Sequence, residues 1–106
     1  MHKGDILPKE AFARLAADPQ AVLLDVRTGP EWTFVGSPAV DRLLRISWQT
    51  FPTMEVNARF AASVSEAGVP KSAPIFCICR SGSRSAQAAS ALTAAGFSSC
   101  FNVAQG

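Results

Sequence analysis

Apolar runs alternate with helix-like segments along this chain. Residues 8–18 begin with proline, an allowed first-turn residue, and place Phe12 and Leu15 three positions apart, which predicts an amphipathic helix. Residues 21–26 then form a short apolar run. Such a run is typical of a strand that is covered on both faces, as strands are in a parallel sheet. The first quarter of the chain therefore predicts a helix followed by a buried strand.

The next segments carry weaker patterns. Residues 28–32 offer a capping-type threonine, a proline and an acid in the order expected at a helix start, so we expect a short helix there. Residues 43–46 are apolar enough to predict a strand, and we interpret residues 48–52 as a loop. This middle part contributes at most one further strand to the predicted sheet.

Two later segments predict helices that end at glycine. Residues 57–67 begin with Asn57 as a candidate cap and stop at Gly68. Residues 85–95 are rich in alanine and stop at Gly96. Glycine tolerates the left-handed conformation that commonly follows the last helical turn, so both helix ends are well marked.

Two further strands complete the alternation. Residues 74–79 form a buried-type strand that ends at Cys79, and residues 97–103 predict the last strand. Strands that alternate with helices indicate an α/β fold in which helices flank a mostly parallel central sheet. Ligands of such sheets bind at the carboxyl ends of the strands, where Cys79 is expected to lie.

Length and composition restrict the class of protein. A chain of 106 residues with 48% hydrophobic and 17% charged residues predicts a single compact domain over residues 1–106. No apolar run approaches the ~20 residues that span a bilayer, and residues 1–5 lack the apolar core of a signal peptide. We therefore expect a cytoplasmic protein with no membrane contact. The net charge of +2 gives no reason to expect a nucleic-acid partner.

The three cysteines are predicted to be thiols. Their number is odd, and residues two apart in an extended strand lie about 6.6 Å apart, which makes Cys77 and Cys79 a poor disulfide pair. His2 is the only histidine, so the chain offers too few ligands for a metal site, and we predict no metal and no cofactor. Cys77 and Cys100 lie in apolar contexts without a basic neighbour, which indicates packing rather than catalysis.

The loop that follows the strand at residues 74–79 carries the chemistry. Backbone N–H groups of such a loop and of the next helical turn point at one spot and attract an anion, so the pKa of the Cys79 thiol is expected to be lowered. The glycine permits an unusual backbone conformation, the serines add small hydroxyl donors, and the arginines add positive charge. The candidate catalytic residue is Cys79, and the candidate substrate-binding residues are Arg80, Ser81, Gly82, Ser83 and Arg84.

The chain resembles the rhodanese-like sulfurtransferases. The resemblance rests on three motifs, with support from the closing segment: Leu24-Asp25-Val26-Arg27-Thr28, Glu31-Trp32, Cys79-Arg80-Ser81-Gly82-Ser83-Arg84-Ser85, and Asn102-Val103-Ala104-Gln105-Gly106. It implies a three-layer rhodanese-like fold, here ending before the family's C-terminal helix. It also implies that Cys79 accepts sulfane sulfur from a small-molecule donor such as thiosulfate, forms a persulfide, and passes the sulfur to a thiophilic acceptor. That acceptor could be cyanide, a thiol or a protein.

Two alternatives remain open at this point. Phosphatases of the same fold have a cysteine loop one residue longer, with arginine six positions after the cysteine; here Arg84 stands five positions after Cys79 and Ser85 stands at six. A phosphatase or arsenate reductase is therefore less favoured. A catalytically idle binding or regulatory module is the other alternative, because residues 36–39 replace the His-Ile-Pro-Gly-Ala stretch common in relatives.

Neighbouring residues receive structural predictions. Asp25 and Arg27 are expected to form a structural pair that ties the strand end to neighbouring loops. Trp32 is expected to pack in or near the core. Trp48 and Phe51 could either pack or line the mouth of a pocket, and the sequence leaves both readings open.

Overall fold

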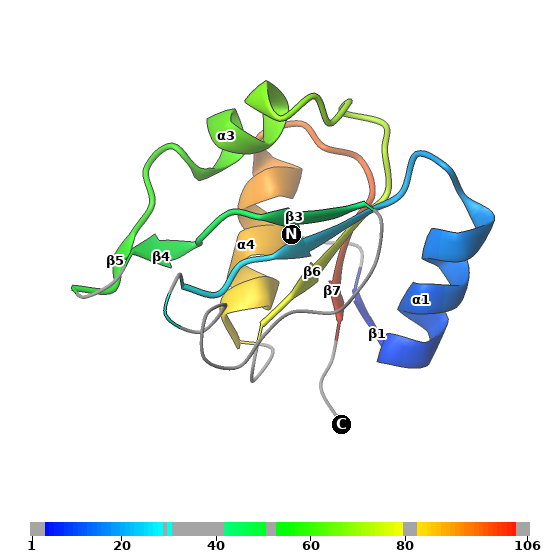
Figure 1. Cartoon of the computed structure of the whole chain (residues 1–106). Helices are drawn as coiled ribbons and strands as arrows, with labels where there is room; N and C mark the ends of the chain where they lie inside the picture. Colours follow the sequence, from blue (N-terminus) through cyan, green and yellow to red (C-terminus); the bar gives the residue numbers. More distant parts are fainter. Residues whose placement is uncertain (1–3, 29, 31–41, 51–52, 80–82, 104–106) are drawn as a thin grey trace.

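Five short strands form the centre of the molecule in the computed structural model, which describes residues 4–28, 30, 42–50, 53–79 and 83–103 (Figure 1). The strand order across the sheet is β1-β7-β6-β2-β3, and each neighbouring pair runs parallel. The predicted mostly parallel sheet is therefore confirmed. The strands are β1 (Asp5–Ile6), β2 (Val22–Asp25), β3 (Leu43–Arg45), β6 (Ile75–Ile78) and β7 (Cys100–Val103).

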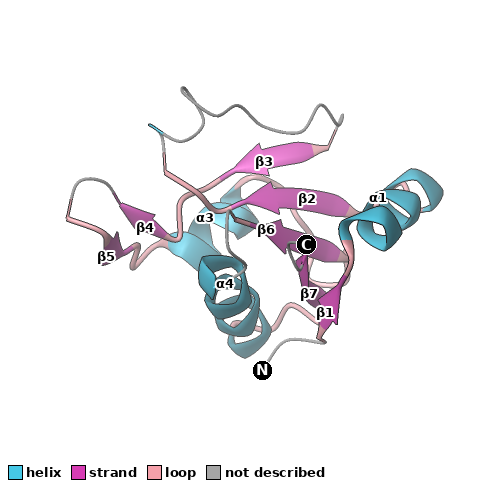
Figure 2. Cartoon of the chain, turned by 90° about the horizontal axis from the view of Figure 1, so that it is seen from below, coloured by secondary structure: helices cyan, strands magenta, loops and turns pink. Residues whose placement is uncertain are grey.

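Helices cover both faces of this sheet. α1 (Pro8–Ala17) packs on one face, whereas α3 (Phe60–Glu66) and α4 (Ser83–Ala94) pack on the other (Figure 2). This is the predicted three-layer α/β arrangement. No helix in the described part of the chain is both long enough and apolar enough to span a membrane.

Strand periodicity explains why the two central strands are apolar throughout. Side chains alternate between faces, so Leu23 and Phe76 belong to the core beneath α1, whereas Leu24 and Cys77 belong to the core beneath α3 and α4. The register pairs Leu23 with Phe76 and Leu24 with Cys77 across β2 and β6. A strand buried on both faces needs apolar residues at successive positions rather than only at alternate ones, which is the pattern that the sequence shows.

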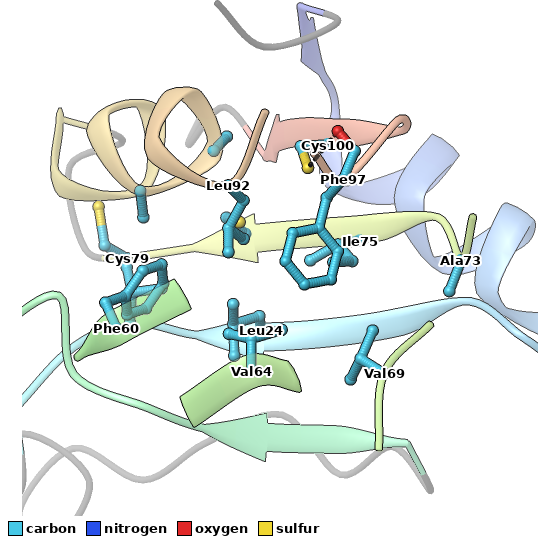
Figure 3. Close-up of a cluster of buried hydrophobic side chains, with 14 residues drawn as sticks. Leu24, Phe60, Val64, Val69, Ala73, Ile75, Cys79, Leu92, Phe97 and Cys100 are labelled. Atoms are coloured by element: carbon cyan, nitrogen blue, oxygen red, sulfur yellow. Dashed lines mark hydrogen bonds between the residues drawn. The ribbon is translucent and has the colours of Figure 1, made fainter. Parts of the chain in front are cut away.

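The larger core lies between the sheet and the pair α3 and α4 (Figure 3). Phe60 and Leu92 approach from the two helices, and Trp48 packs edge-on against Phe60 with ring centroids 5.3 Å apart. Trp48 therefore packs on this core, which is one of the two positions that the sequence left open for it. The buried side chains here are Leu24, Val26, Phe60, Val64, Val69, Ala73, Ile75, Cys77, Cys79, Ala88, Ala89, Leu92, Phe97 and Cys100.

The predicted loop over residues 48–52 is wrong in part. β4 (Gln49–Thr50) pairs antiparallel with β5 (Glu55–Val56), and the Met54 N–H donates to the Thr50 carbonyl across the connecting turn. Strands of two residues that bury neither face show no alternation of apolar and polar residues, so the pattern gave no signal for this hairpin.

β1 was also not predicted, because it is two residues long and lies in the polar opening of the chain. Parallel pairing with β7 holds it in the sheet, with Asp5 opposite Asn102 and Ile6 opposite Val103.

The starts of two helices differ from the predictions by two or three residues. α3 begins at Phe60 rather than at Asn57, because the Asn57 side-chain oxygen accepts the Arg59 N–H at 3.0 Å in a turn that precedes the helix. α4 begins at Ser83, two residues earlier than predicted. The helix expected over residues 28–32 falls mostly outside the described residues, as do Trp32 and Phe51.

The carboxyl ends of the central strands meet at one edge of the sheet. Beyond the strands proper, the Val26 N–H donates to the Ile78 carbonyl at 3.0 Å, and the Trp48 N–H donates to the Val26 carbonyl at 3.1 Å. These bonds hold the segment after β2 between the end of β6 and the segment after β3. The loop after β6 therefore starts from a firmly held edge, as expected for a ligand site of a parallel sheet.

A buried ion pair strengthens this edge. The Arg27 guanidinium meets the Asp25 carboxylate through two parallel contacts, Nε to Oδ1 at 2.9 Å and Nη2 to Oδ2 at 2.7 Å. Both residues are buried, and the Ser47 hydroxyl donates to the Arg27 carbonyl at 2.9 Å. The geometry agrees with the structural pairing predicted for these two residues.

Breaking this pair from one side should strongly destabilise the protein. Arg27→Met takes the guanidinium away from the buried Asp25 carboxylate, so we expect it to lower the free energy of unfolding by about 3–5 kcal/mol in urea titrations. Arg59→Met is the matched control, because Arg59 also forms a 2.7 Å ion pair, with Glu66, but both side chains are about two-thirds exposed. The control should cost less than about 1 kcal/mol. Equal losses in the two variants would contradict a special role for the buried pair.

The buried thiols of the core should make the protein less stable as the pH rises into the alkaline range. Burial raises the pKa of the Cys77 thiol well above its ordinary 9.0 and also raises the pKa of Cys100. As the pH rises, the unfolded chain therefore loses these protons before the folded chain does. Their contribution is complete below about pH 9 and declines above it, by up to about 1.4 kcal/mol per pH unit for each thiol.

We expect Cys77→Ala to show a shallower fall of the urea midpoint with pH above about 9 than the unsubstituted protein does. Comparing slopes rather than absolute stabilities removes the cost of the lost side-chain volume. Identical slopes would show that the Cys77 thiol is not the titrating group.

Candidate active site

Cys79 directly follows β6 at the carboxyl edge of the sheet. It continues the alternation of Ile75 and Cys77, so its side chain lies on the face covered by α4. Figure 3 shows its sulfur turned toward the start of α4. The residue is only 3% exposed, and the apolar core lies beneath it.

The first turn of α4 contacts this sulfur directly. The Ser85 backbone N–H donates to Sγ at 3.4 Å, and the Ser85 hydroxyl oxygen lies 3.3 Å from Sγ. The first N–H groups of a helix have no partner within the helix, and the helix dipole makes this end positive. The N–H contact therefore favours negative charge on sulfur, whether a thiolate or a group bound to it.

The structure brings part of the predicted loop to the site. Ser83 and Arg84 form the first residues of α4, where Ser83 is exposed and Arg84 is half-buried. Arg80, Ser81 and Gly82 lie outside the described residues. The convergence of their N–H groups on the sulfur, and the lowered pKa of Cys79, stay predictions.

Sequence reasoning missed a row of polar side chains behind the sulfur. We call Cys79, Ser85, Asn102 and Asp5 the polar row. The Ser85 hydroxyl donates to the Asn102 side-chain oxygen, and the Asn102 side-chain nitrogen donates to the Asp5 carboxylate at 3.1 Å. Asn102 is the only polar residue in the four-residue strand Cys100–Val103, and that was the available signal.

Aromatic and amide groups flank the same face. The Trp48 indole N–H donates to the Gln87 side-chain oxygen on α4 at 2.9 Å, and Trp48 packs on Phe60. These contacts connect the segment after β3 to both helices beside the candidate site. Cys77 and Cys100 are fully buried free thiols, in agreement with a packing role.

This arrangement suits nucleophilic chemistry on sulfur. A thiol lies at the end of a central strand, beside the positive end of a 12-residue helix, with a buried ion pair holding the neighbouring strand end. The only histidine of the chain, His2, is outside the described residues.

Comparison with known proteins places these features in a family. The Rhodanese-like domain family matches residues 8–106. A Rickettsia rickettsii protein named "Uncharacterized protein RP600 homolog" is 36% identical over 109 residues, covering 100% of this chain and 85% of that protein. "Uncharacterized protein RP600" of Rickettsia prowazekii is 32% identical over 103 residues, covering 96% of this chain and 81% of that protein.

Solved structures agree with this assignment. The crystal structure of Rv0390 from M. tuberculosis is similar with a TM-score of 0.89 and 36% identity, over 100% of this chain and 80% of that one. The polysulfide-sulfur transferase homodimer of Wolinella succinogenes gives a TM-score of 0.76 at 24% identity, over 96% of this chain and 68% of that one, and supports the fold alone. With the family match over nearly the whole sequence and the cysteine at the end of β6, this chain belongs to the rhodanese-like domain family.

Proposed function

We propose that this protein is a sulfurtransferase that carries sulfane sulfur as a persulfide on Cys79. The observation that carries the proposal is the contact between the Cys79 sulfur and the first turn of α4, where the Ser85 N–H donates to Sγ at 3.4 Å. An anionic sulfur is favoured there, and an anionic sulfur is the nucleophile that accepts the transferred atom.

The proposed reaction has two displacements. The Cys79 thiolate attacks the outer sulfur of thiosulfate, the new S–S bond forms, and sulfite leaves with the electron pair of the bond that breaks. The terminal sulfur of the persulfide is then attacked by a thiophilic acceptor. With cyanide as the acceptor, thiocyanate leaves and the Cys79 thiolate is restored. Neither step needs a proton or an external oxidant.

The environment, rather than a general base, supplies the activated nucleophile in this proposal. The chain has a single histidine, His2, and no histidine lies within the described ranges. Helix N–H groups and the predicted arginines Arg80 and Arg84 would stabilise the thiolate instead. Substrate binding by Arg80, Ser81, Gly82, Ser83 and Arg84 is part of the proposal.

The physiological donor need not be thiosulfate. A distant fold relative is named a polysulfide-sulfur transferase, and polysulfide offers the same kind of outer sulfur to a thiolate. A thiol or a protein thiol could take the place of cyanide. The donor test should therefore include thiosulfate and polysulfide side by side.

Loop length favours sulfur over phosphate. Arg84 stands five residues after Cys79. By the family resemblance, this spacing belongs to loops that hold a sulfur atom. A phosphate-ester assay should accordingly show no turnover that depends on Cys79.

Steady-state kinetics provide the functional test. With thiosulfate and cyanide varied together, we expect parallel double-reciprocal lines for thiocyanate formation, because donor product leaves before the acceptor reacts. Cys79→Ser should reduce the rate at least about a hundredfold, because a hydroxyl is a far weaker nucleophile at its ordinary pKa.

Cys100→Ala is the matched control. It also removes a buried thiol. Cys100, however, pairs with Ile75 at the start of β6, whereas Cys79 follows the end of β6. Its rate should stay near that of the unsubstituted protein once the folded fraction is equal. Failure of thiosulfate, polysulfide and every other sulfane donor to support turnover, together with slow alkylation of Cys79, would favour the idle binding module instead.

A further inference from the structure

The polar row crosses a sheet face that is otherwise apolar. Cross-strand register places Asn102 between Asp5 on β1 and Cys77 on β6, and Cys79 lies two residues beyond Cys77 on the same face. Ser85 is fully buried and Asn102 is 5% exposed. Burying a polar side chain costs free energy unless it is hydrogen-bonded. The direction of each of these bonds determines which group is left to donate to the Cys79 sulfur.

The directions of these hydrogen bonds follow from chemistry. An ionised Asp5 carboxylate can only accept, so the Asn102 side chain must turn its NH₂ group toward Asp5, at 3.1 Å. The Asn102 oxygen then faces Ser85 and can only accept. Ser85 has one hydroxyl hydrogen, and that hydrogen is committed to Asn102.

The commitment decides what Ser85 offers to the sulfur. Its hydroxyl oxygen lies 3.3 Å from the Cys79 sulfur, but with the hydrogen directed at Asn102 it presents a lone pair. A lone pair can accept a hydrogen bond from a thiol S–H and does not stabilise a thiolate. Among the groups of Ser85, the backbone N–H remains the donor to sulfur, at 3.4 Å.

We propose that Asn102 and Asp5 are positioning residues that hold the Ser85 hydroxyl away from donating to the Cys79 sulfur. The thiolate is thereby kept less stabilised, and more reactive, than the neighbouring hydroxyl could make it. This positioning acts on the bare thiolate. Its link to sulfur loading rests on the function proposed above.

Loading of sulfur onto Cys79 makes the withheld hydrogen bond from Ser85 unimportant for the stability of the loaded form. In a persulfide the negative charge moves to the outer sulfur, and Sγ, which then has two covalent bonds, becomes a weak acceptor. Withholding the Ser85 hydroxyl therefore disfavours the unloaded thiolate but not the loaded form. The polar row should shift the equilibrium toward the persulfide at a given ratio of donor to acceptor.

Other titratable groups occur on the surrounding elements. The titratable groups of the described elements packed on this face and at its edge, apart from the polar row, are Cys77 on β6, Cys100 on β7, Arg84 on α4, Asp25 on β2 with Arg27 after it, Arg45 on β3, and Glu66 on α3. The test therefore uses substitutions that leave all of them in place.

The test measures the pKa of Cys79 from the pH dependence of its alkylation by iodoacetamide, with the Cys79 peptide quantified by mass spectrometry and no sulfur donor present. Asn102→Ala changes no formal charge and releases the Ser85 hydroxyl to donate to the thiolate. We expect it to lower the pKa of Cys79 by roughly one unit. Ser85→Ala should leave this pKa unchanged or lower it slightly, because the withheld hydroxyl contributes nothing to the thiolate.

The double variant Ser85→Ala with Asn102→Ala should match Ser85→Ala alone, since Asn102 acts only through Ser85. A rise in the pKa of Cys79 in Ser85→Ala would overturn the proposal, because it would show that the hydroxyl already donates to the thiolate. An Asn102→Ala variant that folds with an unchanged pKa would overturn it as well.

Asp5 provides a second route if Asn102→Ala does not fold. Asp5 is exposed, and Asp5→Ala should lower the pKa of Cys79 by freeing the Asn102 side chain to reverse. Asp5→Asn is the matched control, because it removes the same charge but keeps an acceptor oxygen for Asn102. Equal shifts in the two Asp5 variants would show a through-space charge effect and would contradict positioning. Because no sulfur donor is used, these outcomes do not depend on whether the protein transfers sulfur.

Discussion

The parallel pairing of β2, β6 and β7 is the constraint on which the rest of the structure depends. It places the carboxyl ends of the strands at one edge, and the backbone hydrogen bond from Val26 to Ile78 holds the residue after β2 against the end of β6 there. Because both faces of the sheet are covered, the central strands are apolar at successive positions. The Cys79 side chain continues this alternation and lies on the face covered by α3 and α4. Position and orientation of the sulfur are therefore products of the core.

Two polar devices are built into that apolar frame. The Asp25–Arg27 ion pair holds the end of β2, where its bidentate geometry offsets the cost of burying two charges. The Ser85–Asn102 bond lies on the other side of Cys79 and governs what the sulfur receives from α4. The first device contributes rigidity and the second contributes electrostatic bias, and both exploit the low dielectric of the interior. In the proposed function, a rigid edge and a controlled set of hydrogen-bond donors would serve a sulfur nucleophile that acts without a general base.

The sequence predicted the parts whose signal is local. The strands at residues 22–25 and 75–78 were found because full burial produces apolar runs, and the helix that ends before Gly96 was found because glycine marks its end. The hairpin of β4 and β5 was missed because its two-residue strands bury no face. Asn102 and Asp5 are 97 positions apart, so their contact follows from the pairing of β1 with β7, and no local pattern encodes it. Cys79 itself was predicted from its place between a buried strand and a helix, whereas the parts played by Arg80, Ser81 and Gly82 stay predictions.

The central claim is that Cys79 carries the transferred sulfur, and mass spectrometry of the treated protein tests it most directly. After incubation with thiosulfate or polysulfide and removal of the donor, we expect the intact mass to increase by one sulfur atom, located on the Cys79 peptide. The added atom should be lost on exposure to cyanide and should be absent from Cys79→Ser. An unchanged mass with every sulfane donor tried, or sulfur located on Cys77 or Cys100 instead, would contradict the account.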